Sequence, residues 1–141
     1  MKEIIATPDA PPALGPYSQA VKINDMIFVS GQLPLDPRSG QIVGTDIRAQ
    51  ADRVLQNIQS ILMEGEASLK DVVKVTVFLA DIADFDEMNK IYGVFFPFHE
   101  TSTALPPARS TVEVSKLPRG ARIEIDVIAV ISHDRRDLEI F

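Results

Sequence analysis

The residues best suited to chemistry lie between positions 106 and 131, where arginines and carboxylates alternate with apolar side chains. Two segments, 109–114 and 121–131, show a period of two, and a short linker containing proline and glycine separates them. This pattern predicts a β-hairpin in which each strand has one polar and one apolar face. If both apolar faces join one core, the shared polar face carries Arg109, Thr111, Glu113, Arg122, Glu124 and Asp126.

An arginine and several carboxylates on one surface fit two interpretations. They could form a binding or catalytic site, or they could be a solvated sheet face joined by cross-strand ion pairs. The alternation alone favours the solvated face, because most such pairs are structural and contribute little.

The same stretch resembles the signature of the RidA/YjgF family of small trimeric imine and enamine deaminases. The similarity lies in Pro107–Ser110, Leu117 and Ile123–Ile125, with the family's spacing between the arginine and the glutamate. Further blocks match in the same order: Gly15–Ala20, Phe28–Gln32, Met88–Tyr92 and Phe95–Phe96. Several separated blocks in order are more specific than any one of them, and they extend the resemblance to about Ile131.

The resemblance implies an enzyme that performs hydrolytic deamination. Family members add water to short 2-imino acids and their enamine tautomers, such as 2-aminoacrylate/2-iminopropanoate and 2-iminobutanoate, and release ammonia and a 2-keto acid. They clear these reactive intermediates in the cytoplasm and need no cofactor. The implied ligand of this chain is therefore a small 2-imino or 2-keto acid.

Two residues match the family's catalytic positions. Arg109 aligns with the arginine that holds the substrate carboxylate, a role that suits the planar guanidinium because its fork matches two oxygens. Glu124 aligns with the glutamate that orients the attacking water and passes a proton to departing ammonia. Such catalysis would depend mostly on positioning and would use no covalent nucleophile.

Five further positions match those that line the family's cleft or lie beside it. Tyr17, Ser30, Gly31 and Asn89 correspond to substrate-binding positions, although each also has an ordinary structural explanation. Thr111 stands two residues after the arginine, where many members have a cysteine. Thr111 keeps a small polar group but not a thiol, so we expect activity without regulation through thiol modification.

Composition narrows the alternatives. The 141 residues fit one domain, placed at 1–131, with a C-terminal extension at 132–141. A net charge of -6 argues against sequence-independent nucleic-acid binding, which depends on basic residues. Two histidines and no cysteine offer few transition-metal ligands, so no metal is expected. No stretch has the apolar length of a membrane span or the pattern of a signal peptide, so a cytoplasmic protein is expected.

Short strands and turns account for the regions on either side of the first helix. Strands are expected at 20–23 and 26–30, joined by an Asn-Asp turn, and at 72–79 after a capped turn at 68–71. The 26–30 strand is apolar on both faces, so it requires cover on each side.

Two helices are expected from the periodicity. The first spans 46–64, with Thr45 as its N-cap and Gly65 at its end, and the second runs from Asp84 to about Phe96. The apolar stripe of the first helix consists of Ile47, Ala51, Val54, Leu55, Ile58, Ile61 and Leu62.

This order of elements predicts an α+β domain with two helices on one face of a mixed sheet. The other face carries apolar residues such as Phe78, Ile128 and Val130, so further copies of the chain are expected to cover it. The resemblance sharpens this to a chorismate-mutase-like, six-stranded mixed sheet that assembles as a homotrimer, with sites in the clefts between subunits.

Two other functions stay open. The Arg109 cleft could hold a 2-keto acid or another small carboxylic acid in a non-enzymatic regulator. Some relatives carry the name of endoribonuclease or translation inhibitor, although the acidic charge speaks against that function here. The tail after Ile131 is either a frayed charged segment or a docking segment that uses Leu138, Ile140 and Phe141.

Overall fold

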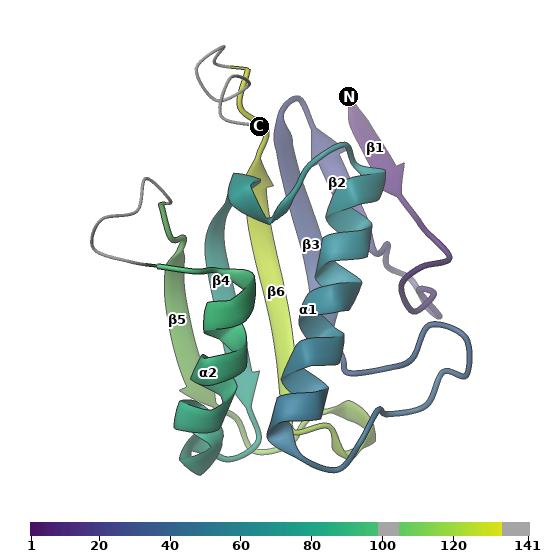
Figure 1. The fold of residues 1–141 in the computed structure, drawn as a ribbon. Coiled ribbons are helices and arrows are strands. Elements are labelled where there is room, and N and C mark those ends of the chain that lie inside the picture. Colours follow the sequence, from purple (N-terminus) through teal and green to yellow (C-terminus); the bar gives the residue numbers. More distant parts are fainter. Residues whose placement is uncertain (99–104, 134–141) are drawn as a thin grey trace.

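The computed structural model describes residues 1–98 and 105–133, which form one six-stranded sheet and two helices (Figure 1). The strands are β1 Lys2–Ile5, β2 Ala20–Ile23, β3 Met26–Gln32, β4 Val72–Leu79, β5 Ala108–Glu113 and β6 Ile123–Val130. The helices are α1 Ile47–Glu64 and α2 Phe85–Phe95, and short 3-10 turns occur at Leu69–Asp71, Ile82–Asp84 and Pro118–Gly120. The strand order is β1-β2-β3-β6-β4-β5, and only β4 and β5 run parallel. The predicted α+β class and mixed six-stranded sheet are confirmed.

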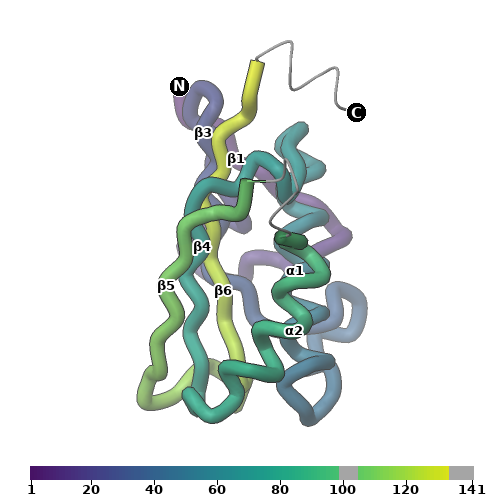
Figure 2. The backbone as a smooth tube through the Cα atoms, turned by 60° about the vertical axis from the view of Figure 1, so that its left-hand side comes forward, coloured from purple at the N-terminus to yellow at the C-terminus, as the bar shows by residue number. Residues whose placement is uncertain are grey.

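Both helices lie on the same face of the sheet, as predicted (Figures 1 and 2). The core fills the space between the two layers. Alternate residues of the central strands enter it, because successive side chains of a strand point to opposite faces. The fully buried members from β4 and β6 are Val75, Val77, Leu79, Ile123, Ile125 and Ala129.

Helix α1 forms where its apolar stripe predicts it. Every residue of that stripe is buried against the sheet or α2. The cap differs by one position, because the Asp46 side chain rather than Thr45 accepts the hydrogen bond from the Ala49 N–H, at 2.8 Å. Gly65 ends the helix as expected, and its own N–H donates to the Ile61 carbonyl.

Helix α2 buries a narrower face than α1. Met88 and Tyr92 are buried, whereas Phe85, Ile91 and Phe95 are half-buried and pack at the edge of the core. The helix lies over the β4 and β5 end of the sheet (Figure 1). Its partly open face is therefore available to position side chains of β5.

The predicted hairpin between residues 109–114 and 121–131 is wrong. β5 and β6 are not neighbours, because β4 lies between them and pairs with both. β6 instead takes β3 as its second neighbour, which makes it a central strand. The alternation had identified the two faces of each strand correctly, but a period of two does not specify which strand lies alongside.

The sheet face turned away from the helices retains exposed apolar side chains. They are Ile4, Ile23, Met26, Phe28, Val112 and Val130, each at least 36% exposed. Register places Ile4, Val21, Phe28 and Ile128 in one row across four strands. The prediction that two helices leave one face uncovered by the described part of the chain is confirmed (Figure 2).

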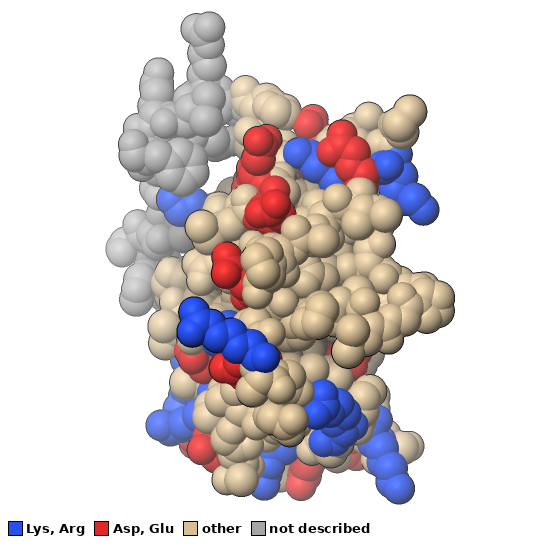
Figure 3. Space-filling view, turned by 90° about the vertical axis from the view of Figure 1, so that its right-hand side faces the viewer, with Lys and Arg blue, Asp and Glu red and all other residues tan. Residues whose placement is uncertain are grey.

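Acidic and basic side chains are interspersed on the side seen in Figure 3. Within residues 1–98 and 105–133, no helix is both long and apolar enough to cross a membrane.

Candidate active site

Arg109 lies on the edge strand β5 and points toward α2. Its Cα partner across the parallel ladder is the buried Val75, so both side chains lie on the helix-covered face. The guanidinium Nη1 donates to Asn89 Oδ1 at 2.7 Å. Its Cζ lies 4.5 Å from the ring centroid of Tyr92 and 5.5 Å from that of Phe85. Three side chains of one helix therefore hold the guanidinium through a hydrogen bond and cation–π contacts.

A cleft of about 520 Å³ opens beside this arginine. Its described lining consists of Asn89, Tyr92, Gly93, Phe96, Pro97, Phe98, Pro106, Pro107 and Arg109. Among these residues, Arg109 carries the charge and most of the others are aromatic or proline. This Arg109 cleft suits a small ligand with one carboxylate and an apolar body.

Two buried hydroxyl groups lie near the guanidinium. Thr111 follows Arg109 by two residues and shares its sheet face, and its Oγ1 has no hydrogen-bond partner among the described residues. The buried hydroxyl of Tyr92 also has no hydrogen-bond partner among the described residues. Burial raises the pKa of Tyr92, and the charge of Arg109 partly offsets this rise, so the phenol stays neutral.

Glu124 lies on the opposite face of the sheet. Its Cα partner on β4 is Phe78, which alternates with the buried Val77 and therefore points away from the helices. On its other side the Glu124 carboxyl covers Gly31 so closely that a Cβ there would lie 2.9 Å from the carboxyl carbon. A side chain at position 31 would therefore force the Glu124 carboxyl to move.

A β-bulge makes room for this contact. Val29 pairs with Val127 and Gln32 with Ile125, so Ser30 and Gly31 together oppose one residue of β6. That single residue is Asp126. We call Ser30, Gly31, Glu124 and Asp126 the Glu124 region.

The loop that carries Tyr17 is fixed to this region by hydrogen bonds. The Ser30 hydroxyl donates to the Ser18 carbonyl at 2.6 Å, and the Ser30 N–H donates to the Gln19 carbonyl at 2.9 Å. The buried Gln19 side chain donates to the Pro11 carbonyl and accepts from the Thr7 N–H. Tyr17 itself is 56% exposed. Sequence analysis did not single out Gln19, whose role is visible only once the proline-rich loop is folded around it.

The two carboxyl groups of the Glu124 region differ in their surroundings. Burial raises the pKa of Glu124, and the negative charge of Asp126 raises it further. Burial also raises the pKa of Asp126, but a hydrogen bond from Thr76 and the charge of Lys74 oppose that rise. Glu124 is therefore the carboxyl of this pair that is better suited to hold a proton.

The structure does not gather the predicted polar face. Arg109, Thr111 and Asn89 come together beside α2, whereas Glu124 comes together with Ser30 and Gly31 on the other face. The sheet separates the two groups, because β4 stands between β5 and β6. Within one chain, Arg109 and Glu124 cannot contact the same small molecule.

Two members of that predicted polar face support the fold. Glu113 accepts from the Ile82 N–H at 3.0 Å, and Arg122 Nη1 lies 3.4 Å from Asp84 Oδ2. Both partners belong to the turn before α2, so these pairs fix the start of that helix. For Glu113 and Arg122 the interpretation as structural polar contacts holds.

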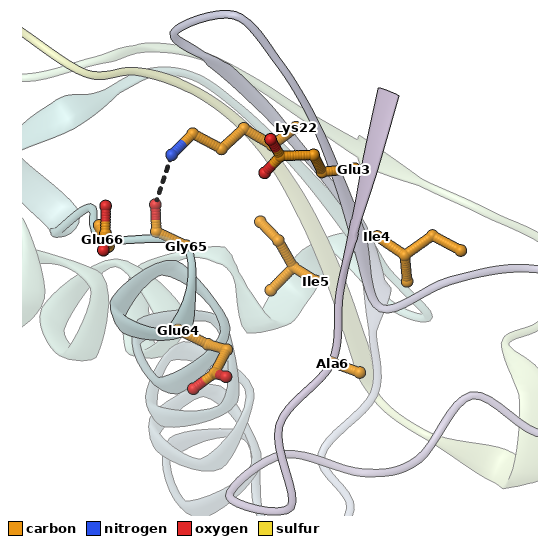
Figure 4. A pocket seen from close by; sticks show the side chains of 8 residues that line it. All are labelled: Glu3, Ile4, Ile5, Ala6, Lys22, Glu64, Gly65 and Glu66. Carbon is orange, nitrogen blue, oxygen red and sulfur yellow. Dashed lines mark hydrogen bonds between the residues drawn. The ribbon is translucent and has the colours of Figure 1, made fainter. Parts of the chain in front are cut away.

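A second hollow, of about 360 Å³, lies between β1 and the end of α1 (Figure 4). Lys22 Nζ donates to the Gly65 carbonyl there at 3.3 Å, beside Glu3, Glu64 and Glu66. None of the predicted site residues lines this hollow.

Of the two histidines, His99 lies outside the described residues, and His133 is exposed and contacts Asp25 at 2.7 Å. The proposed docking residues of the tail also lie outside the described residues.

Known proteins are similar over nearly the whole chain. The family described as Endoribonuclease L-PSP matches residues 7–131. A RutC family protein of Pyrococcus abyssi is 51% identical, over 91% of this chain and 96% of the relative. A 2-iminobutanoate/2-iminopropanoate deaminase of Salmonella typhimurium is 44% identical, over 92% of this chain and 98% of the relative. The crystal structure of E. coli TdcF with bound serine has a TM-score of 0.85 and 42% identity, covering 92% of this chain and 99% of that one.

Proposed function

The chain belongs to the RidA/YjgF family of reactive intermediate deaminases, described as Endoribonuclease L-PSP, and we propose that it hydrolyses short 2-imino acids and their enamine tautomers. The products would be a 2-keto acid and ammonia. The observation that carries this proposal is the Arg109 guanidinium, held by Asn89 and Tyr92 at the wall of an apolar cleft. The deaminase from Salmonella typhimurium supports it as a relative that is similar over nearly its whole length and carries the name of this activity.

Arg109 binds the substrate carboxylate in the proposed mechanism. Asn89 occupies one guanidinium nitrogen, so other donors of the fork can meet two carboxylate oxygens. The imino acid is then fixed with its C2 carbon away from the guanidinium. Orientation of this kind contributes more to such a hydrolysis than any covalent chemistry.

Glu124 performs the proton transfers. Water adds to C2 of the imine, and the C=N double bond becomes a C–N single bond in a tetrahedral carbinolamine. One proton of the water goes to the imine nitrogen in this addition. Glu124 then delivers a second proton to the nitrogen, ammonia leaves with the electron pair of the C–N bond, and the C2 hydroxyl returns a proton to the Glu124 carboxylate as the keto group forms. The raised pKa of Glu124, caused by burial and by the charge of Asp126, favours this donor role.

The two residues belong to different subunits in this proposal. Arg109 and Glu124 lie on opposite faces of one sheet, so a complete site needs Arg109 from one copy and Glu124 from another. The exposed apolar side chains on the Glu124 face supply a reason for copies to associate. We therefore propose a homotrimer with three sites between subunits, in which the Tyr17 loop and Ser30 accompany Glu124.

One alternative has structural support of its own. The Arg109 cleft, with Asn89, Tyr92 and Thr111, is assembled within one chain and could retain a 2-keto acid without turnover. Such a protein would be a carboxylate-binding regulator. A ribonuclease receives no comparable support, because the net charge is -6 and the site offers one arginine rather than a basic groove.

The experiment that tests the proposal couples an amino-acid dehydratase, which generates 2-aminoacrylate or 2-aminocrotonate, to a continuous measurement of keto-acid formation. Wild type should accelerate the reaction, and both Arg109→Ala and Glu124→Gln should lose the acceleration. Losing one charged hydrogen-bonding partner alone corresponds to roughly tenfold to a hundredfold in kcat/KM. No acceleration by wild type on any short imino acid would exclude the deaminase, and 2-keto acid binding lost in Arg109→Ala would then identify the regulator.

A further inference from the structure

We propose that Asp126 is a further functional residue: a positioning carboxylate that keeps the proton on Glu124 until ammonia receives it. This inference rests on the proposed function, because it assigns Glu124 the role of proton donor. It adds a residue that the sequence analysis placed on a polar face but not in the site.

The geometry places the two carboxyl groups side by side. Glu124 and Asp126 are two residues apart on β6 and therefore project from the same sheet face. Both are half-buried. Phe78 flanks Glu124 on β4, and Gly31 lies beneath its carboxyl on β3, so solvent screens the two carboxylates from each other less than it would on a fully exposed surface.

The neighbouring strand stabilises the charge of Asp126 rather than that of Glu124. Thr76 is the Cα partner of Asp126 on β4 and donates a hydrogen bond to it. Lys74, two residues earlier on the same strand, adds a positive charge near Asp126 and donates to Ser110 Oγ at 2.9 Å. Asp126 is thus the carboxyl that ionises first, and its charge then disfavours ionisation of Glu124.

The described charged groups that face this pair are few. β6 contributes Glu124 and Asp126, β4 contributes Lys74, and the facing residues of β3 are the uncharged Ser30 and Gly31. Arg122 lies two residues before Glu124, but its guanidinium pairs with Asp84 in the turn before α2. An ionised Asp126 is therefore the nearest described negative charge that can hold the proton on Glu124. Two adjacent carboxyls with different partners are a known route to one acid and one base at the same pH.

A titration that needs no turnover tests the inference directly. The full-length protein is labelled with carboxyl-¹³C glutamate, and the Glu124 signal, identified by its absence in Glu124→Gln, is followed against pH. In Asp126→Asn, which keeps the size and shape of the side chain, the midpoint of Glu124 should move to lower pH. In Asp126→Glu, which restores the charge, it should return toward the wild-type value.

The pH–rate profile supplies the second measurement. The fall of wild-type kcat/KM at high pH should begin at lower pH in Asp126→Asn and move back toward the wild-type position in Asp126→Glu. Equal Glu124 midpoints in wild type and Asp126→Asn would overturn the inference, and so would a midpoint that moves upward. If wild type deaminates no imino acid, the proposed function fails separately, and the titration still decides whether Asp126 controls the proton on Glu124.

Discussion

The Arg109 cleft and the Glu124 region are built in opposite ways. Arg109 is fully supported within its own chain, by Asn89 at 2.7 Å and by the rings of Tyr92 and Phe85. Among the described residues Glu124 has no such support, because its carboxyl lies over the backbone of Gly31 and beside another carboxylate. One half is preorganised for an anion, and the other is left short of a partner.

This difference corresponds to the two roles in the proposed mechanism, carboxylate binding and proton transfer. Binding a carboxylate requires a fixed cation, and helix α2 fixes it before any ligand arrives. Proton transfer requires a carboxyl whose proton is neither too tightly nor too loosely held. A carboxyl that has no cationic partner and lies beside another carboxylate meets that requirement. Because the sheet separates the halves, they meet only where two copies of the chain come together.

The largest expected effect comes from mixing two inactive variants. Arg109→Ala and Glu124→Gln should each lose activity as a pure protein. When the two chains are co-expressed and assemble at random, about a quarter of the sites between subunits combine an intact arginine with an intact glutamate. Activity of the mixture should therefore rise far above that of either variant, measured in the coupled keto-acid assay.

The control for mixing is a chain that carries both substitutions. Co-assembly of Arg109→Ala with the double variant can create no intact site and should give no recovery. If mixing Arg109→Ala with Glu124→Gln gives none either, although mixed oligomers are present by mass spectrometry, the division of the site between subunits is wrong.

A methyl group at Gly31 should break the Glu124 half alone. Its Cβ would overlap the Glu124 carboxyl, so Gly31→Ala displaces the proton donor and should lower kcat/KM by about 100-fold. Gly93→Ala is the matched control, because a Cβ there meets no described atom within 4 Å although Gly93 lines the Arg109 cleft. Equal activities of the two variants would show that the close approach of Glu124 to Gly31 has no catalytic meaning.

Much of this architecture followed from the sequence because local patterns determine it. The stripe from Ile47 to Leu62 specified α1, and alternation specified which residues of β6 face the core. Which strands lie side by side in the sheet depends instead on contacts between distant parts of the chain. β5 and β6 were expected to be adjacent because they are consecutive in the sequence. Instead β4 lies between them and contributes buried valines beside both strands. The stability comes from burying apolar side chains of three strands together, which no short stretch of sequence indicates.

The candidate site residues came from the sequence, but their arrangement in space did not. Resemblance supplied Arg109 and Glu124 individually, and the hairpin error then placed them on one face. No role at the site was predicted for Tyr92 or Phe85, because their contact with Arg109 depends on how helix α2 crosses β5. Asp126 was visible as a polar residue at period two, but nothing local indicates that Thr76 and Lys74 lie opposite it.

A smaller effect, on ligand affinity, is expected from removing the hydrogen bond that Asn89 accepts from Arg109. Asn89→Ala removes one hydrogen bond to the guanidinium and leaves both aromatic contacts, so the dissociation constant for a 2-keto acid should rise about fivefold, equivalent to roughly 1 kcal/mol. Isothermal titration calorimetry measures it. Lys90→Ala is the control on the same helix, since its exposed pair with Glu87 should contribute little. Equal affinities of Asn89→Ala and wild type would show that the aromatic rings suffice to hold Arg109.

The smallest expected effect is on stability, and it has the opposite sign from the effect on activity. The pKa of Glu124 is raised in the folded state, so the folded protein binds more protons than the unfolded chain between the two pKa values, and stability falls as pH rises through that interval. Glu124→Gln removes the ionisable group, so its melting temperature should exceed that of wild type at neutral pH. The melting temperatures of Glu124→Gln and wild type should converge as the pH falls toward the ordinary glutamate pKa of about 4.3. A variant that is less stable than wild type at neutral pH would mean that Glu124 is held by favourable contacts, and the contrast with Arg109 would be lost.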